Sequence, residues 1–374
     1  MSKFVVSARK YRPVRFEDVI GQNHIARTLQ NAIQTDQLAH AFLFCGPRGV
    51  GKTTCARILA KVINCENPVN KVEPCNVCSS CKSFNENASF NIFELDAASN
   101  NSVEDIRELT DQVRFAPQVG KYKIYIIDEV HMLSSAAFNA FMKTLEEPPA
   151  HAIFILATTE KHKIIPTILS RCQIYDFKRI TIEDIQIHLK KIAEKESIQY
   201  EEDALYLIAQ KADGALRDAL SIFDRLATFT QKNITLAKAA EVLNILDYDQ
   251  YLNIVDLAHQ NKISETLFAF NEIVKKGFDS HLFIAGLGNH FRDLMMAQNP
   301  QTLSLIEVGD QTKIKFSEQS KSWNVQQLID AIEICNHADI NYKNSKNPRL
   351  TVEIALMQLS SLTAVGVESK KKNS

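Results

Sequence analysis

Apolar residues in the first half of the chain gather in short runs, which longer stretches with helical spacing separate. The runs that predict strands cover residues 41–45, 90–95, 122–127, 152–157 and 173–177. Such apolar runs are typical of strands that are buried on both faces of a parallel sheet. We therefore expect residues 1–180 to form an α/β domain in which helices flank the sheet.

The pattern changes after residue 180, where almost no strand signal remains. Thr181 can cap a helix with an acidic first turn, and helical periodicity follows it. Three more helices are predicted over residues 202–211, 216–228 and 236–246. Together these helices predict a small helical domain over residues 181–243.

Longer helical patterns continue toward the end of the chain. They predict a second all-helical domain over residues 244–365. The last residues, 366–374, are polar and rich in lysine, so we expect a disordered tail.

The length of 374 residues favours two or three domains. No apolar run reaches the roughly 18 residues of a membrane-spanning helix, and the first ten residues lack the apolar core of a signal peptide. We expect a cytoplasmic protein, in which disulfides are disfavoured. The net charge of −1 excludes a strongly basic, histone-like DNA-binding protein but leaves room for a local basic surface.

The segment Gly-Pro-Arg-Gly-Val-Gly-Lys-Thr at 46–53 matches the phosphate-loop pattern G-x-x-x-x-G-K-[ST]. It follows a predicted strand and precedes a predicted helix over 53–63, as the motif requires. Glycines let backbone N–H groups curl around a phosphate at the helix N-terminus. The residues expected to bind nucleotide here are Gly46, Pro47, Arg48, Gly49, Val50, Gly51, Lys52, Thr53 and Thr54.

Two of these residues have side chains with specific expected roles. Lys52 should reach the β- and γ-phosphates of ATP, and the Thr53 hydroxyl should bind Mg²⁺. The alternative is a glycine-rich turn without a ligand. That alternative fits poorly, because three of only 11 glycines in the chain fall within six positions of this loop.

The predicted strand at 122–127 runs directly into Asp128 and Glu129. A carboxylate at the tip of a parallel strand beside the phosphate loop can hold Mg²⁺, and we assign this role to Asp128. Glu129 can orient and polarise an attacking water. The pair therefore favours hydrolysis of the nucleotide over phosphate transfer to another acceptor.

Four cysteines, Cys65, Cys75, Cys78 and Cys81, follow the phosphate-loop helix with the spacing C-x9-C-x2-C-x2-C. Four thiolates suit a closed, tetrahedral, structural zinc site. The alternatives are an iron–sulfur cluster, which four cysteines also hold, a DNA-reading zinc finger, and unrelated surface cysteines. Only Lys71 and Lys82 lie nearby as basic residues, so we favour a structural module. The other four cysteines, at 45, 55, 172 and 335, are expected to be core residues.

Further motifs lie outside these sites, at residues 11–22, 145–149, 156–160, 170–172 and 214–218. Together with the phosphate loop and the cysteine insertion, they resemble the AAA+ ATPases of the clamp-loader group, in particular those of bacterial DNA polymerase III. The resemblance covers about residues 5–365. It implies an AAA+ domain with a zinc insertion, a helical lid domain and an all-helical collar that oligomerises.

The resemblance also implies roles for single residues. Tyr11, Arg12 and the backbone near Val19 would line the adenine pocket. Thr159 would be the sensor 1 hydroxyl near the γ-phosphate, and Arg217 would be the sensor 2 arginine of the lid. Without the resemblance, Arg217 reads as an ordinary charge at a helix N-terminus.

Arg171, in Ser170-Arg-Cys172, would be an arginine finger that acts in the site of a neighbouring subunit. An arginine there neutralises charge on the transferring phosphoryl group. The plain alternative is a surface arginine at the start of a strand.

The implied function is the ATPase motor that loads a sliding clamp on primer–template DNA. The implied partners are delta and delta-prime subunits and further copies of this chain. One departure concerns DNA contacts, since Asn100, Asn101 and Ser102 stand where positive charge is common in the family. We expect weak phosphate contacts from this segment.

Two other functions stay open at this stage. A DNA translocase or helicase motor can use the same ATPase core. A non-catalytic replication scaffold is the other alternative, although the intact Lys52-Thr53 and Asp128-Glu129 pairs argue against it.

Overall fold

The computed structural model describes residues 5–86, 88–117, 120–243, 246, 248–306 and 310–363, without the side chains of 310 and 311. The expected disordered tail, 366–374, lies outside the described residues. The chain divides into two compact units, Met1–Ala239 and Ala240–Ser374, and each is described by itself. The predicted domain boundaries near 180 and 243 stay predictions. None of the described helices is both long and apolar enough to span a bilayer.

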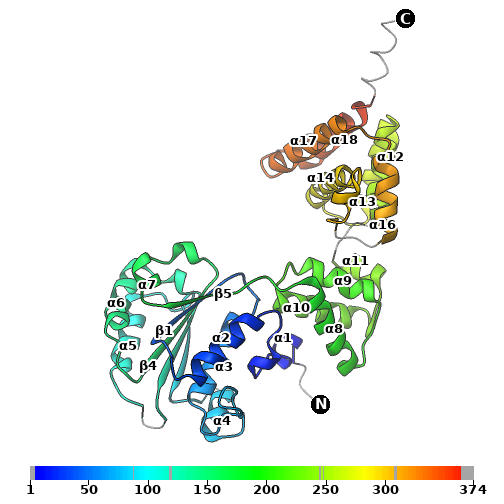
Figure 1. Cartoon of the computed structure of the whole chain (residues 1–374). Helices are drawn as coiled ribbons and strands as arrows, with labels where there is room; N and C mark the ends of the chain where they lie inside the picture. Colours follow the sequence, from blue (N-terminus) through cyan, green and yellow to red (C-terminus); the bar gives the residue numbers. More distant parts are fainter. Residues whose placement is uncertain are drawn as a thin grey trace, which may run out of the picture. The chain divides into compact units, whose positions relative to one another are not determined.

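The first unit contains a parallel sheet, which has five strands within the described residues and the order β2-β3-β4-β1-β5 (Figure 1). The strands are β1 Ala41–Cys45, β2 Ile92–Asp96, β3 Lys123–Asp128, β4 Ala152–Thr158 and β5 Gln173–Asp176. All five predicted strands are confirmed. Strand β2 begins two residues later than predicted, and Phe90 lies outside it with its side chain exposed.

Helices cover both faces of this sheet, as the predicted α/β fold requires (Figure 1). Helices α2 (Asn23–Gln34) and α3 (Lys52–Ile63) pack with one face, to which Phe42 and Phe44 of β1 belong. Helices α5 (Val103–Val113) and α6 (Ser135–Glu146) cover the other face, to which Leu43 of β1 belongs. Side chains along a strand alternate between faces, so every position of β1 is buried.

The remaining helices of the first unit are short or belong to its helical part. The short ones are α1 Ser7–Lys10, η1 Phe16–Asp18, α4 Ser79–Asn85, η2 Val130–Met132, η3 Lys161–Lys163 and α7 Pro166–Leu169. The helical part holds α8 Ile182–Glu196, α9 Glu202–Lys211 and α10 Leu216–Phe229, and α11 Leu236–Val242 crosses the division between the two units. The Thr181 side chain caps α8 as predicted.

One feature of the helical part was missed from the sequence. Strands β6 (Gln199–Tyr200) and β7 (Asn233–Ile234) form a parallel pair. Each strand has two residues, which is too short to leave a periodic signal.

The second unit is all-helical within the described residues, which confirms its predicted class. Its helices are α12 Tyr248–His259, α13 Ile263–Lys275, α14 Ser280–Ala297, α15 Pro300–Leu303, α16 Asp310–Ser320, α17 Val325–Tyr342 and α18 Pro348–Ser361. A single apolar core, which includes Phe283, Phe291, Phe316 and Trp323, joins them. Pro348 opens α18 at its first position, where a missing N–H costs nothing.

Candidate nucleotide site and metal centre

The phosphate loop joins β1 to α3 through backbone conformations that favour glycine. Gly46 has a φ of +144°, and a Cβ there would lie 2.4 Å from the carbonyl oxygen of Phe177. Gly51, with a φ of +107°, caps α3 in the left-handed region. Because the loop ends on the N-terminus of a 12-residue helix, its N–H groups and the helix dipole suit an anionic ligand.

A cavity of about 400 Å³ opens beside this loop in the first unit. Of the predicted nucleotide-binding residues, its lining includes Tyr11, Arg12, Val19, Arg48, Gly49, Val50, Gly51, Lys52, Thr53, Thr54 and Arg217. Asp128 and Glu129 also line it. Gly46 and Pro47 lie outside the lining, and their carbonyl groups instead bind Lys52. The apolar residues Ile20, Ile180, Leu216 and Leu220 complete a pocket that suits a nucleotide base.

Lys52 is buried, with 5% of its surface exposed. Its Nζ donates hydrogen bonds to the carbonyl oxygens of Gly46 at 2.7 Å and Pro47 at 2.8 Å. Burial lowers the pKa of Lys52, and the charges of Glu129 and Asp128 work against that effect. A phosphate ligand would supply the negative charge that the carbonyl groups lack.

Thr53 and Asp128 meet at the cavity, where the Thr53 hydroxyl donates to Asp128 Oδ2 at 2.7 Å. Both groups offer the oxygen ligands that Mg²⁺ prefers. Thr53 lies in the first turn of α3 and Asp128 ends β3, so two rigid elements position them. The residue types and their direct contact fit the predicted magnesium site.

Glu129 follows Asp128 with a φ of +48°, which is rare for a non-glycine residue. Its Oε2 accepts hydrogen bonds from the Thr159 hydroxyl at 2.9 Å and the Thr159 backbone N–H at 3.2 Å. The predicted base and the predicted sensor are therefore in direct contact. Thr159 itself does not line the cavity, whereas Glu129 does.

Sequence reasoning missed His131, which lies behind Glu129 with only 6% of its side chain exposed. Its Nδ1 lies 3.0 Å from Thr158 Oγ1 and 3.4 Å from Glu129 Oε2. Its Nε2 lies 3.0 Å from Glu160 Oε2. The imidazole thus connects the ends of β3 and β4 around Glu129. In the sequence, only the polar residues that follow each of these strands could have indicated this contact.

Four basic residues, Arg12, Arg48, Lys52 and Arg217, line the cavity beside the carboxylates of Asp96, Asp128 and Glu129. Arg217 approaches the phosphate loop through its backbone, whose N–H donates to the Gly49 carbonyl oxygen at 3.4 Å. Burial lowers the pKa of Arg12, and the nearby positive charges of Arg57 and Arg217 lower it further. Such a concentration of like charges favours a polyanionic ligand.

The segment that carries Tyr11 and Arg12 is fastened to the helical part of the first unit. The Tyr11 hydroxyl and the Lys10 ammonium both bond to Glu196 at the end of α8. The Ser7 N–H donates to Asp224 of α10 at 2.6 Å. This side of the cavity is therefore held by α8 and α10, whereas the phosphate loop belongs to the sheet.

Arg171 lies between α7 and β5, outside the lining of the described cavity. Its guanidinium donates to Glu146 Oε1 at 3.0 Å and to the Thr167 carbonyl oxygen at 2.8 Å. About a third of its side chain is exposed. The residue is thus accessible to another molecule and held in place by α6 and α7.

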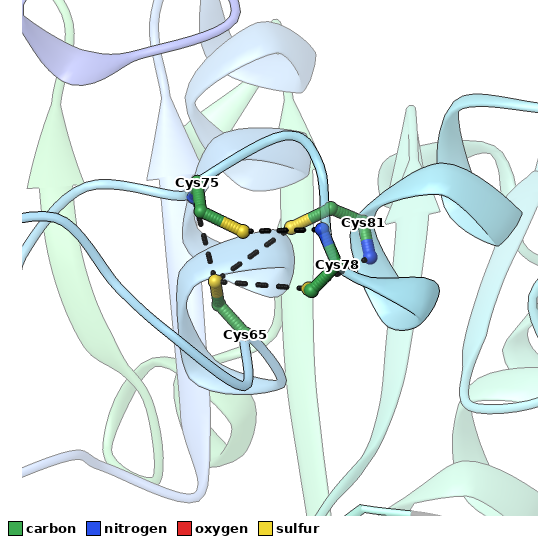
Figure 2. Close-up of side chains that lie close together, drawn as sticks. All are labelled: Cys65, Cys75, Cys78 and Cys81. Atoms are coloured by element: carbon green, nitrogen blue, oxygen red, sulfur yellow. Dashed lines mark hydrogen bonds between the residues drawn. The ribbon is translucent and has the colours of Figure 1, made fainter.

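The four cysteines converge on one point, and their side chains face one another (Figure 2). Their sulfur atoms all lie within 4.8 Å of one another, with Cys65 Sγ 3.7 Å from Cys81 Sγ and 4.0 Å from Cys78 Sγ. A tetrahedral zinc ion with Zn–S bonds of about 2.3 Å would place its sulfurs about 3.8 Å apart. The sulfur positions fit zinc, and the full set of four leaves no open coordination position.

Backbone N–H groups also point toward the sulfur atoms, as in Cys75 N to Cys65 Sγ at 3.4 Å and Cys78 N to Cys75 Sγ at 3.3 Å. Backbone N–H groups of Val77 and Cys78 lower the pKa of the Cys75 thiol to about 6. Donors of this kind favour the thiolate form that binds metal. Burial acts in the opposite direction on Cys65 and Cys81 and raises the pKa of both thiols.

The neutral residues 100–102, which precede α5, have a structural role in this turn. Ser102 caps α5 and forms a capping box, in which its Oγ accepts from the Asp105 N–H and Asp105 accepts from the Ser102 N–H, each at 3.2 Å. Asn100 Nδ2 donates to the Asp96 carbonyl oxygen at 3.0 Å. These side chains therefore hold the turn between β2 and α5.

A phosphate loop between β1 and α3, an Asp-Glu pair at the end of β3 and a helical part that brings Arg217 to the same cavity define a P-loop protein of the AAA+ class. Residues 21–210 match the family described as DNA polymerase III, delta subunit. Residues 234–372 match the family described as DNA polymerase III subunits gamma and tau domain III.

Individual relatives agree with these matches. The chain is 44% identical over 355 residues to DNA polymerase III subunit tau of Bacillus subtilis. This match covers 94% of this chain and 62% of that protein. It is 39% identical over 338 residues to DNA polymerase III subunit gamma of Buchnera aphidicola. This second match covers 90% of this chain and 88% of that protein. The chain belongs to the family of DNA polymerase III gamma and tau subunits.

The chain spans only part of the longer relatives. The match to DNA polymerase III subunit tau of Escherichia coli, at 41% identity, covers 80% of this chain and 47% of that protein. Among solved structures, the RuvB Holliday junction branch migration motor of Thermotoga maritima is similar with a TM-score of 0.48 and 21% identity, over 66% of this chain and 78% of that chain.

Proposed function

We propose that this chain is the ATP-hydrolysing motor subunit of a clamp loader, which couples ATP binding and hydrolysis to the loading of a sliding clamp on primed DNA. The observation that carries the proposal is the single cavity lined by the phosphate loop, Asp128, Glu129 and Arg217 in a chain of the gamma and tau family. A pure scaffold would have no need for this set of residues.

In this proposal the adenine of ATP lies beside Tyr11, Arg12 and Val19, and the phosphates lie on the loop over 46–54. Lys52 exchanges its carbonyl partners for the β- and γ-phosphates. Arg217 binds the phosphates from the helical part, so nucleotide binding would draw α10 and the sheet together. The contact of Tyr11 with α8 supports the same coupling, because it attaches the segment proposed to bind the base to the helical part.

Thr53 and Asp128 would hold Mg²⁺, which supplies neutralising charge to the phosphates when bound. Glu129 orients a water and accepts its proton as the water attacks the γ-phosphorus and ADP leaves. Thr159 supports Glu129 through the two hydrogen bonds to Oε2. The four cysteines would hold one structural zinc ion.

Arg171 would complete the site of a neighbouring subunit. Its partial exposure and its absence from the lining of its own cavity support this role. We expect Arg171→Ala to keep ATP binding and to lose DNA-stimulated turnover in the assembled complex, by roughly 10³-fold. Arg225→Ala, which changes an exposed arginine of α10, is the matched control. Normal turnover of Arg171→Ala would remove the finger assignment.

The proposed partners are delta and delta-prime subunits, further copies of this chain, the clamp and primer–template DNA. Residues 1–180 would form the ATPase domain, 181–243 the lid and 244–365 the collar through which subunits assemble. The contacts of Asn100 and Ser102 within their own turn support weak DNA contacts from that segment.

A clamp-loading assay tests this function. The chain, assembled with its partner subunits and ATP, should place labelled clamp on circular primed DNA, where it stays after the loader is washed away. The Lys52→Met assembly should leave the DNA without clamp. Strand separation without clamp loading would instead identify a helicase motor, and loading without ATP would identify a scaffold.

A further inference from the structure

Lys61 lies in the last turn of α3 with only 4% of its surface exposed. Its Nζ donates hydrogen bonds to Asn76 Oδ1 at 2.5 Å and Asn85 Oδ1 at 3.2 Å. Both acceptors are neutral, and no carboxylate in the described part of the chain forms an ion pair with Lys61. A buried ammonium without a counter-charge is strongly unfavourable. The position therefore needs negative charge from another source.

Both acceptors belong to the segment that carries the four cysteines. Asn76 lies between Cys75 and Cys78, and Asn85 ends the helix that holds Cys81 (Figure 2 shows the cysteines). Burial lowers the pKa of Lys61, and the charge of Arg57 lowers it too, whereas the charges of Cys81, Cys65 and Cys75 raise it. Four thiolates around a divalent metal ion leave two net negative charges, so the cluster has an excess that an ammonium group can offset.

We propose that Lys61 is the internal counter-ion of the four-cysteine metal site, held in place by the amide oxygens of Asn76 and Asn85. The assignment rests on the proposed zinc site. It also makes α3 a direct connection between the two sites, since the helix begins with Lys52 and ends with Lys61 in its last turn.

The matched control is Lys82, which adjoins Cys81 in sequence but is exposed on α4. Lys61→Met and Lys82→Met remove the same charge and nearly the same volume. Water screens the exposed charge, so only the buried one should matter to the metal. Lys61→Arg keeps the charge and is the conservative variant.

The experiment loads each full-length variant with zinc, measures the zinc content, and then follows zinc release to a chromophoric chelator. We expect Lys61→Met to release zinc at least tenfold faster than the unaltered chain, as loss of a partner next to metal ligands typically does. Lys61→Arg should stay within about threefold and Lys82→Met within about twofold. An unaltered chain without zinc would overturn the metal site itself. If the unaltered chain held one zinc and Lys61→Met released it at the same rate, only the counter-ion assignment of Lys61 would be overturned.

A second measurement separates charge from simple anchoring of the loop, and Lys61→Gln serves if Lys61→Met does not fold. With Co²⁺ in place of zinc, loss of a nearby positive charge should shift the thiolate-to-cobalt charge-transfer band to longer wavelength, because the thiolates then give up an electron more readily. Lys61→Arg should leave the band in place. An unshifted band in Lys61→Gln would contradict the proposal.

Discussion

Helix α3 has a buried lysine near each end, and the two lysines lie beside different kinds of candidate site. Lys52 is 5% exposed and bonds two backbone carbonyl groups beside an open cavity. Lys61 is 4% exposed and bonds two side-chain amides beside a closed set of four cysteines. In both cases neutral oxygens orient an ammonium whose full counter-charge comes from elsewhere.

The difference lies in where that negative charge comes from. At the N-terminal end the cavity leaves room for an anion that enters and leaves, as a nucleotide does. At the C-terminal end the chain provides its own thiolates, so the charge stays with the fold. In both proposals, a buried lysine with neutral partners marks an anion site, and the surrounding residues decide whether the anion is exchangeable or permanent.

The largest effect should follow from breaking the closed site. Cys78→Ser should lower the zinc content from about one per chain to nearly none, because three thiolates leave the tetrahedral set incomplete. ATP binding should stay within a few-fold, since no cysteine of the cluster lines the nucleotide cavity. Elemental analysis and nucleotide titration measure both, with Cys172→Ser as the control. If ATP binding were lost together with the zinc, the cysteine site and the nucleotide site at the two ends of α3 would not be independent.

The next effect concerns the open site. Lys52→Met should weaken ATP binding at least 100-fold, because it removes the cation that faces the phosphates. Without nucleotide, the same variant should raise the free energy of unfolding, because burial disfavours the ammonium. Lys61→Met should instead lower the stability of the zinc-loaded chain. If both variants changed the free energy of unfolding in the same direction, the contrast drawn between the two lysines would be wrong.

The lowered pKa of Lys52 also predicts a pH dependence. Between its folded-state pKa and its ordinary value of 10.5, the unfolded chain holds the proton that the folded chain has released. The stability of the nucleotide-free chain should therefore rise with pH in that window and should level off above it. Comparison of denaturant unfolding between the unaltered chain and Lys52→Met isolates this contribution, which the variant should lack.

Glu129→Gln should separate binding from chemistry within the open site. The variant keeps the shape of the side chain but cannot accept a proton, so turnover should fall by roughly 10²-fold or more while ATP affinity is kept. Glu183→Gln, at an exposed glutamate of α8, should leave both unchanged. Turnover above a tenth of the unaltered rate would remove Glu129 as the base.

His131→Gln should have a smaller effect on the same reaction. The imidazole touches Thr158, Glu129 and Glu160 but does not line the cavity. We expect turnover to fall roughly tenfold through misplacement of Glu129, with ATP affinity within twofold. A change in affinity with turnover intact would assign His131 to the fold rather than to Glu129.

The smallest effect should come from Ser102→Ala, far from both ends of α3 in sequence. The loss of the capping box at α5 should lower the free energy of unfolding by about 1 kcal/mol. Zinc content and ATP affinity should not change. A variant as stable as the unaltered chain would show that the turn before α5 does not depend on its cap.

The sequence predicted the sheet and the phosphate loop because both leave local patterns. Apolar runs such as 152–157 mark strands buried on both faces, and the spacing of Gly46, Gly51 and Lys52 is a continuous motif. The cysteine cluster was equally visible, since its four ligands lie within 17 residues.

Other parts of the sites depend on contacts between distant positions. His131 reaches Glu160 of another strand end, and Lys61 reaches Asn76 and Asn85 across the insertion. Nothing in a stretch of apolar and polar residues distinguishes a buried lysine at the end of a helix from an exposed one. Ser102 was read as a missing charge, although it is a helix cap.

The most direct test of the motor function is the ATP turnover of the assembled complex, measured with and without clamp and primed DNA. The account predicts slow turnover by the chain alone and strong stimulation only when partner subunits, clamp and DNA are all present. Full turnover by the isolated chain, or no response to clamp and DNA, would contradict it.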